Sequence, residues 1–383
     1  MRAIHFVAAS ALVVAASTSA SVPTDNPRKS ALDRAVDTAA ASFFSDRCHV
    51  GVSIAITDHG RRNFYDYGTV SKARPRVPTR RSLYEIGSIT KTFTGALAAK
   101  ALLEGKMSLD SDFRGYLKEA YPNLESGGKP ITLRTLANHT SGMSRDIPNN
   151  DDLFKGKPDF DKLPYLLMAR EKGYDRARYL RELHDLQLGS EPGAKMSYSN
   201  IGIKLIGFGL EDVAGLDLGR LLARDISGPL HLTDTTFILS QSQRGRLAQA
   251  YLPGGNPAPP PQQDIDPNAG AAGGLFSSTD DMVKYAEWQL DERDPVIARA
   301  HQPLWGSADS FAAGLIWDIG KTPDGERKLW HSGGTFGMSS QLILLPDSRQ
   351  AYVLLANDAC MNTQSQLYEM AMTIRAAVRN PQH

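Results

Sequence analysis

A serine at the start of a predicted helix has the spacing that nucleophilic catalysis requires. Ser88 follows Gly87 and precedes an apolar helical pattern that ends at Gly105. Lys91 comes one helical turn later, so it lies on the same face of this helix. A serine hydroxyl attacks a carbonyl only when a nearby base takes its proton, and burial can lower the pKa of a lysine enough for this role. The pair therefore predicts acyl transfer to Ser88.

The pattern Ser-x-x-Lys is common and does not by itself identify a site. The segment Ser126–Lys129 matches it too, but lies in a glycine-rich stretch without helical periodicity, which we interpret as a solvated turn. Taken alone, the match at Ser88 is more often a helix cap followed by a solvated lysine. The chemistry therefore depends on further residues elsewhere in the chain.

A tyrosine and an asparagine two residues apart form a second candidate element. Tyr198 and Asn200 follow the turn Glu191–Gly193, and a tyrosine there could exchange a proton with Ser88. The segment Tyr121–Asn123 has the same spacing and reads as an ordinary turn. Taken alone, either tyrosine could simply pack in the core.

A polar segment with two glycines forms the third element, just before the C-terminal strands. A strand with glycines lets a ligand backbone approach closely and lie alongside it, although glycines also mark simple bulges at strand edges. The segment consists of His331, Ser332, Gly333 and Gly334.

The elements that must position these residues come from both ends of the chain. Each end combines one predicted helix with strand patterns: a helix over 29–44 and strands over 50–56 and 63–68, then strands over 341–345 and 351–356 and a helix over 367–378. The segment between about 88 and 300 is rich in helical patterns and loops. The prediction is an α+β fold, in which both termini (about 27–87 and 300–383) form an antiparallel sheet flanked by helices. A mainly helical half (about 88–299) is inserted between them.

The three elements in this order resemble the motifs of the serine β-lactamase and penicillin-binding superfamily. The match consists of Ser88-x-x-Lys91, Tyr198-x-Asn200 and His331–Gly333. It is most similar to the class C-like branch, which includes class C β-lactamases, D-Ala-D-Ala carboxypeptidases, D-aminopeptidases and related esterases. The segments 136–143 and 273–282 also resemble this branch, and the resemblance extends over about residues 30–380.

The resemblance implies a role for each residue of the motifs. Ser88 would form an acyl-enzyme, while Lys91 and Tyr198 would share its proton, with the identity of the base left open. Asn200 would orient the substrate amide and Lys91. The backbone N–H groups of Ser88 and Gly334 would form the oxyanion hole.

The third motif departs from the pattern of the penicillin-processing members, which usually carry Lys-Thr-Gly. A lysine supplies a permanent charge for a substrate carboxylate, whereas His331 would be only partly charged near neutral pH. We therefore expect weak β-lactamase activity at most. Arg145 is either the substitute cation for substrate binding or a solvated loop charge.

The resemblance favours a peptidoglycan D-Ala-D-Ala carboxypeptidase or endopeptidase acting through an acyl-enzyme. A class C-like β-lactamase, an esterase or a D-aminopeptidase on the same scaffold are the alternatives. In each case the partner is a peptide or small molecule with an amide or ester carbonyl, such as a D-Ala peptide or a β-lactam. A binding protein without catalysis is disfavoured because Ser88, Lys91 and Tyr198 are all present.

Composition narrows the classes of partner. The 383 residues include 43 Lys and Arg and 42 Asp and Glu, so the net charge of +1 gives no basic face for nucleic acid. Only two cysteines and scattered histidines are present, so we expect neither a metal site nor a cofactor.

The N-terminus and the two cysteines indicate export. Residues 1–20 combine Arg2, an apolar run over 6–16 and Ala20, which predicts a secretory signal peptide followed by a single catalytic domain over 21–383. The apolar run is too short for a transmembrane anchor. We therefore expect a periplasmic or secreted protein. In such a compartment Cys48 and Cys360 are candidates for a disulfide, with two buried thiols as the alternative.

Overall fold

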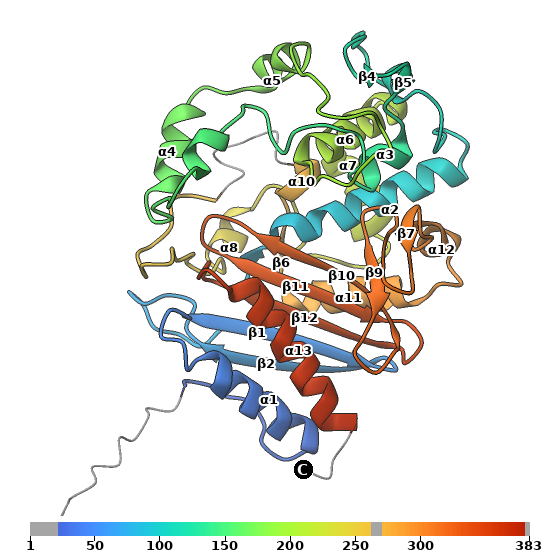
Figure 1. Ribbon diagram of the computed structural model, residues 1–383. Helices are drawn as coiled ribbons and strands as arrows, with labels where there is room; N and C mark the ends of the chain where they lie inside the picture. Colours follow the sequence, from blue (N-terminus) through green and yellow to red (C-terminus); the bar gives the residue numbers. More distant parts are fainter. Residues whose placement is uncertain (1–21, 262–269, 380–383) are drawn as a thin grey trace, which may run out of the picture.

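The computed structural model describes residues 22–261 and 270–379 and is built around one eight-stranded antiparallel sheet (Figure 1). The strand order is β2-β1-β12-β11-β10-β9-β8-β7, so β1 from the N-terminal part of the chain pairs directly with β12 from the C-terminal part. The predicted signal peptide, residues 1–20, lies outside the described residues. Within those ranges, no helix has both the length and the apolar character that crossing a membrane requires.

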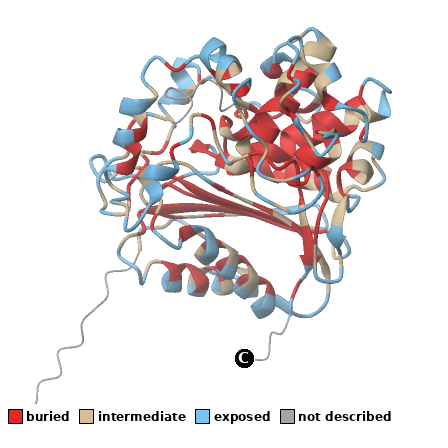
Figure 2. Cartoon of the chain, turned by 45° about the horizontal axis from the view of Figure 1, so that its top comes forward, coloured by how far each residue is buried: buried red, intermediate tan, exposed pale blue. Residues whose placement is uncertain are grey.

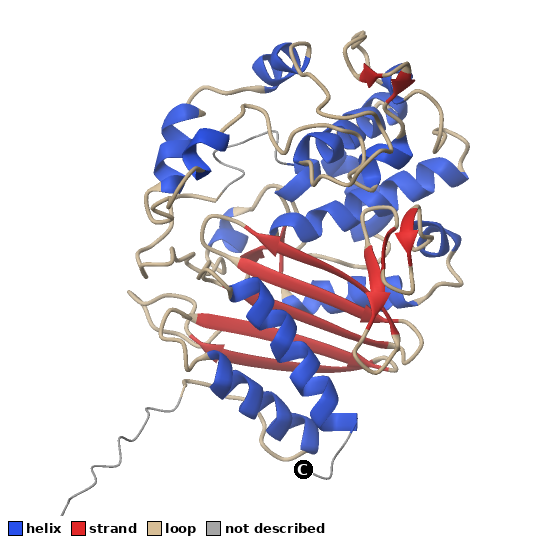
Figure 3. Cartoon of the chain, viewed as in Figure 1, coloured by secondary structure: helices blue, strands red, loops and turns tan. Residues whose placement is uncertain are grey.

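The strands of this sheet are β1 Gly51–Asp58, β2 Arg61–Gly68, β7 Trp305–Ser307, β8 Phe311–Ala313, β9 Asp318–Lys321, β10 Arg327–Gly334, β11 Ser339–Leu345 and β12 Gln350–Ala356. Two small pairs lie outside it, β3 Tyr84–Glu85 with β6 Phe276–Ser277, and β4 Glu125–Ser126 with β5 Lys129–Pro130. Figure 3 shows the large sheet as a layer between two groups of helices.

The α-helices are α1 Ala31–Phe43, α2 Thr90–Leu103, α3 Leu133–Ala137, α4 Leu163–Arg170, α5 Arg176–Leu183, α6 Asn200–Ala214, α7 Leu218–Leu222, α8 Gln241–Arg244, α10 Gly270–Gly273, α11 Thr279–Leu290, α12 Pro295–Ala300 and α13 Thr363–Arg379. Short 3₁₀ turns span Gly87–Ile89, Phe113–Tyr116 and Asp151–Phe154, and a π-helical turn spans Ala223–Ser227.

The terminal helices α1 and α13 pack side by side against one face of the sheet (Figure 1). Each has apolar residues at helical spacing on the side that faces the strands, and those of α13 include Leu367, Met370 and Ile374. Their partners on the sheet include Ile54 and Leu354. The predicted fold class is confirmed: a large antiparallel sheet is flanked by helices, and both chain ends contribute to it.

The opposite face of the sheet carries α11 and, beyond it, the helical half that contains α2. Helix α2 is buried on nearly all sides because α6, α10 and α12 pack around it, and its Phe93 stacks on Tyr285 of α11. Figure 2 shows the buried residues concentrated in the sheet and in the middle of this helical half. Helix α11 packs on β1 and β12. The last part of the span 88–299, which the sequence assigned to the helical half, therefore lies directly on the sheet.

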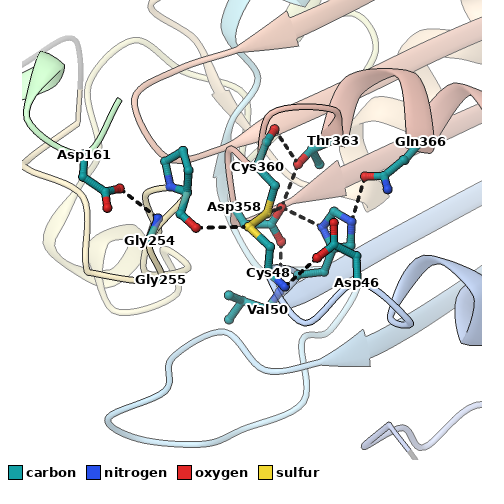
Figure 4. The surroundings of a disulfide bond; sticks show 12 residues. Asp46, Cys48, Val50, Asp161, Gly254, Gly255, Asp358, Cys360, Thr363 and Gln366 are labelled. Carbon is teal, nitrogen blue, oxygen red and sulfur yellow. Dashed lines mark hydrogen bonds and ion pairs between the residues drawn. A yellow bond between two sulfur atoms is a disulfide. The ribbon is translucent and has the colours of Figure 1, made fainter. Parts of the chain in front are cut away.

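A disulfide joins Cys48 to Cys360, with the two Cα atoms 6.2 Å apart (Figure 4). It links the residues just before β1 to the turn after β12. His49 and Asp358 form a buried pair beside it, with His49 Nδ1 3.0 Å from Asp358 Oδ1. The backbone N–H of Val50 donates to the other oxygen of Asp358. This cluster fixes the start of β1 relative to the end of β12, the strand that pairs with it.

Candidate active site

Ser88 lies in a tight turn between β3 and α2, at the wall of a pocket of about 910 Å³. The turn requires glycine at position 87, where φ is +50° and a Cβ atom would lie 2.7 Å from the backbone nitrogen of Gly334. The sequence predicted a helix that opens at Ser88. In the structure Ser88 belongs to a 3₁₀ turn, and α2 begins two residues later at Thr90.

Lys91 and Tyr198 both contact the hydroxyl of Ser88. Lys91 Nζ and the Tyr198 hydroxyl each lie 2.9 Å from Ser88 Oγ. Lys91 is the second residue of the buried helix α2, whereas Tyr198 precedes α6, so separate elements bring the two groups to the same oxygen. Lys91 also hydrogen-bonds the carbonyl of Ala272 in α10. The structure thus brings together the three residues that the sequence singled out.

Burial has opposite effects on the two proton-carrying groups. The side chain of Lys91 is fully buried, and loss of solvation holds its pKa well below the ordinary value. The same effect raises the pKa of Tyr198 to about 12, although the bond to Ser88 opposes it. A larger fraction of Lys91 therefore carries a free amine that can accept a proton near neutral pH, while Tyr198 keeps its proton.

His139 holds Tyr198 in place, a role that the sequence did not reveal. The two rings lie 4.4 Å apart between centroids, and the backbone N–H of Ser199 donates to His139 Nδ1. His139 has φ of +58°, a left-handed backbone conformation that is uncommon outside glycine. Burial lowers the pKa of His139 to about 3, so the ring is a neutral acceptor.

The glycines of β10 allow this strand to run against the nucleophile turn. A Cβ on Gly333 would lie 2.1 Å from the carbonyl oxygen of Ile86 and 3.0 Å from the nitrogen of Ser88. Ser340 of the neighbouring strand donates to the same carbonyl of Ile86. Ser88 and Gly334 both line the pocket. Their positions suit an oxyanion hole formed by the two backbone N–H groups.

His331 is buried in β10 and lines the pocket with Ser332. Its Nδ1 lies 2.8 Å from the carbonyl oxygen of Ser332. Burial lowers the pKa of His331 to about 4. The imidazole is therefore neutral at pH 7, not partly charged as the sequence suggested, because burial disfavours its charged form.

Asn200 and Arg145 also line the pocket and share one partner. Asn200 Nδ2 donates to both carboxylate oxygens of Asp146, at 2.9 and 3.2 Å. Arg145 Nε lies 3.5 Å from the same carboxylate, and its guanidinium lies 5.3 Å from the ring centre of Tyr198. Across the described parts of the chain, no hydrogen bond joins Asn200 to Lys91. Arg145 remains largely exposed at 67% of its side-chain surface.

The segments Ser126–Lys129 and Tyr121–Asn123, which match the motif patterns by chance and are called decoy motifs here, do not line the pocket. Ser126 and Lys129 lie in the small pair β4 and β5, where the turn glycines have positive φ and Lys129 is exposed. Tyr121 is buried beside His184, with ring centroids 4.4 Å apart, and does not line the pocket. Both matches are therefore structural turns, as their sequence context suggested.

Sequence reasoning missed several side chains that line the pocket. They come from the segment 146–174, from α6, from β9 and from the start of α13, and they include Asp146, Glu171, Lys204, Asp318 and Gln364. These segments carry no motif, and only the fold brings them to Ser88. Gln364 lies close to the motif, since a Cβ on Gly334 would meet its side-chain amide at 2.4 Å.

Residues 32–372 match the model of the β-lactamase family. The chain therefore belongs to the β-lactamase family. Among curated relatives it is 26% identical over 320 residues to Protein flp of Staphylococcus aureus strain MRSA252, covering 80% of this chain and 59% of that protein. It is 28% identical over 282 residues to a β-lactamase of Providencia stuartii, covering 70% of this chain and 64% of that one. The chain thus spans about three fifths of the length of these relatives.

Solved structures show the same fold. A β-lactamase/D-alanine carboxypeptidase from Pseudomonas syringae superimposes with a TM-score of 0.73 at 22% identity, covering 91% of this chain and 99% of that one. A D-alanine carboxypeptidase from Burkholderia cenocepacia gives 0.74 at 21% identity, with coverage of 90% and 99%. A class C β-lactamase in complex with cefoxitin gives 0.75 at 19% identity, with coverage of 90% and 98%.

Proposed function

We propose that this member of the β-lactamase family is a serine hydrolase that forms an acyl-enzyme on Ser88. The observation that carries the proposal is the position of Ser88 Oγ, 2.9 Å from both Lys91 Nζ and the Tyr198 hydroxyl at the wall of a large pocket. A nucleophile, a base within reach and two candidate oxyanion donors are the parts that acyl transfer needs. The family assignment supports the same chemistry.

Lys91 is the general base of the proposed acylation step. Its amine takes the proton of Ser88 Oγ while this oxygen bonds to the substrate carbonyl carbon, and the carbonyl oxygen becomes the oxyanion at the N–H groups of Ser88 and Gly334. Tyr198 donates its proton to the leaving group as the carbon–heteroatom bond breaks, and the proton held by Lys91 then restores the tyrosine. Water next attacks the ester carbonyl while Lys91 takes its proton. This proton then passes to Ser88 Oγ as the acyl–oxygen bond breaks, which releases the acid product and restores Ser88.

The neutral state of His331 makes some of the candidate substrate classes less favourable than others. A carboxypeptidase must hold the terminal carboxylate of its peptide, and an uncharged imidazole contributes no positive charge to that task. This favours an endopeptidase that cuts within a D-amino-acid peptide, or an esterase, over a carboxypeptidase. A strong β-lactamase is disfavoured for the same reason. One observation keeps the carboxypeptidase as second candidate: the exposed guanidinium of Arg145 lies at the pocket and over the Tyr198 ring.

Intact-protein mass spectrometry tests the proposed nucleophile. The protein is mixed with a neutral nitrophenyl ester or with benzylpenicillin and quenched at short times. We expect an adduct of the acyl mass with the ester, which is lost in Ser88→Ala because the attacking oxygen is gone. Ser126→Ala serves as the matched control, since it alters the decoy motif and should retain the adduct. A stable adduct in Ser88→Ala would contradict the proposed function.

Benzylpenicillin separates the two substrate classes in the same experiment. A long-lived penicillin adduct on Ser88 would mean that the pocket accepts this carboxylate, which favours the carboxypeptidase. Acylation by the ester without a penicillin adduct would support the endopeptidase or esterase.

A further inference from the structure

Asp318 is a carboxylate that lines the catalytic pocket without a partner. It is the first residue of β9, which pairs with β10 next to the segment that carries His331. Among the residues that the structure describes, none hydrogen-bonds or ion-pairs with its side chain. Carboxylates that are largely withdrawn from water usually have a cation or several donors beside them. A positively charged ligand group would therefore be stabilised beside Asp318, because no described residue of the chain supplies such a partner.

The carboxylate of Asp318 is largely shielded from water but lines the pocket, where a ligand could reach it. Burial alone raises its pKa to about 6, so it still carries its charge at pH 7. Its charge also contributes to the raised pKa of Tyr198, which indicates that the carboxylate acts on the reacting end of the pocket. A cation bound here would restore the stabilisation that burial removes.

The other charges of the pocket strengthen this preference. Its described lining holds four carboxylates, Asp146, Asp151, Glu171 and Asp318, against two cations, Arg145 and Lys204. Asp146 is engaged by Asn200 and Arg145, and Glu171 accepts a bond from Asn150. The histidines that line the pocket are neutral at pH 7, because burial lowers the pKa of each. The lining as a whole is acidic and leaves Asp318 uncompensated.

We propose that Asp318 binds a positively charged amine of the substrate, so that this serine hydrolase prefers esters or amides that carry an ammonium group near the reacting carbonyl. The inference rests on the proposed acyl-enzyme function and specifies its substrate class. An ammonium would form a charge-assisted hydrogen bond with Asp318, whereas a carboxylate in the same place would face a like charge. Asp318 is in this view a substrate-binding residue that determines specificity, and it takes no part in proton transfer.

Three arylboronic acids test the preference without knowledge of the natural substrate. Boronic acids add reversibly to a serine nucleophile, so phenylboronic acid, 3-(aminomethyl)phenylboronic acid and 3-carboxyphenylboronic acid place no charge, an ammonium or a carboxylate beside the same adduct. Their inhibition constants are measured at pH 7.5 against a neutral nitrophenyl ester. We expect the aminomethyl compound to bind about tenfold or more tighter than the parent, and the carboxy compound to bind more weakly.

Two variants assign the preference to Asp318. Asp318→Asn keeps the size of the side chain and removes its charge, so the ratio between the aminomethyl and parent constants should fall to about one. Asp151→Asn is the matched control, because it removes a carboxylate from a different segment of the same pocket lining and should keep the ratio. An equal loss in both variants would overturn the assignment to Asp318.

The same measurements distinguish a failure of the proposed hydrolase function from a failure of the role proposed for Asp318. If phenylboronic acid forms no adduct with Ser88 and the neutral ester is not turned over, the proposed hydrolase function is wrong. If the parent compound binds and the ester is turned over, but the aminomethyl group gives no gain in the unmodified protein, only the inference about Asp318 is wrong.

Discussion

At the scale of single residues, burial assigns different tasks to two groups that touch the same oxygen. Lys91 and Tyr198 lie at equal distances from Ser88 Oγ, so geometry alone does not distinguish them. Loss of solvation disfavours the charged form of each, which is the protonated form for lysine and the deprotonated form for tyrosine. We therefore propose that the lysine is the base and the tyrosine the acid at the start of the reaction.

The pH dependence of acylation tests this assignment. Lys91 accepts a proton only above its own pKa, so kcat/KM for a neutral ester should rise with pH through that value. Because burial lowers the pKa of Lys91, this rise should lie well below pH 10.5. Tyr198→Phe should lower the rate by about 10²- to 10⁴-fold but retain the rise, because the amine remains.

Lys91→Arg supplies the comparison, since a guanidinium stays protonated over the accessible range and cannot act as base. We expect no measurable acylation in this variant at any pH between 5 and 9. A pH rise that survives in Lys91→Arg and disappears in Tyr198→Phe would reverse the two roles.

At the scale of elements, the close contact between β10 and the nucleophile turn builds the site. The sequence could predict both elements, because their motifs combine glycine with polar residues beside recognisable helix and strand patterns. The contact itself could not be predicted, since it depends on how two distant segments pack. It leaves no room for a Cβ at Gly87 or Gly333.

Gly333→Ala tests this contact. Its Cβ would overlap the carbonyl oxygen of Ile86 and must push β10 away from the turn, which displaces the N–H of Gly334. We expect a loss of about 10²-fold or more in kcat, as for removal of one oxyanion donor. The free energy of unfolding should fall by about 1–3 kcal/mol, because overpacking strains the strand.

Gly115→Ala is the matched glycine control, because nothing lies within 4 Å of the added methyl and its φ is not positive. Both properties should stay close to those of the unmodified protein. Activity in Gly333→Ala equal to that of Gly115→Ala would show that the contact does not position the oxyanion hole.

Two site residues, Asp318 and His139, could not be predicted because the local structure that places them leaves no clear pattern in the sequence. Strands β7, β8 and β9 are only 3, 3 and 4 residues long, too short for a clear alternation of apolar and polar residues. Because β9 could not be predicted, the position of its first residue, Asp318, in the pocket could not be predicted either. The place of His139 beside Tyr198 could not be predicted either, because His139 has a left-handed backbone conformation that a histidine in the sequence does not indicate.

At the scale of the whole molecule, both ends of the chain are parts of one layer. Strand β1 pairs with β12 from Val52↔Ala356 to Asp58↔Gln350, although almost 300 residues separate them. The sequence predicted this arrangement because the two ends show matching helix and strand patterns. The helical half can therefore be inserted without breaking the sheet, and the pocket forms where the two meet.

The disulfide closes this layer covalently. Cys48 and Cys360 are 312 residues apart in sequence, so their bond restricts the unfolded chain over nearly the whole molecule. The residues beside it reach the pocket, since Ala359 lies in the pocket wall, as does Pro253, whose carbonyl oxygen contacts Cys48 Sγ at 3.4 Å (Figure 4). A disulfide in this position fits the exported location that the N-terminal sequence predicts.

Replacement of both cysteines by serine should lower the free energy of unfolding by about 2–5 kcal/mol, because the unfolded chain regains the entropy of a very long loop. Denaturant unfolding of Cys48→Ser/Cys360→Ser beside the oxidised protein measures this change. Treating the unmodified protein with a reductant before unfolding should reproduce the loss, while the double variant should no longer respond to reductant. Acylation of Ser88 at 25 °C should persist in the folded variant, because Ser88, Lys91 and Tyr198 come from elements that the disulfide does not join. An unchanged unfolding midpoint would mean that the packing of β1 against β12 already holds the two ends together without the covalent link.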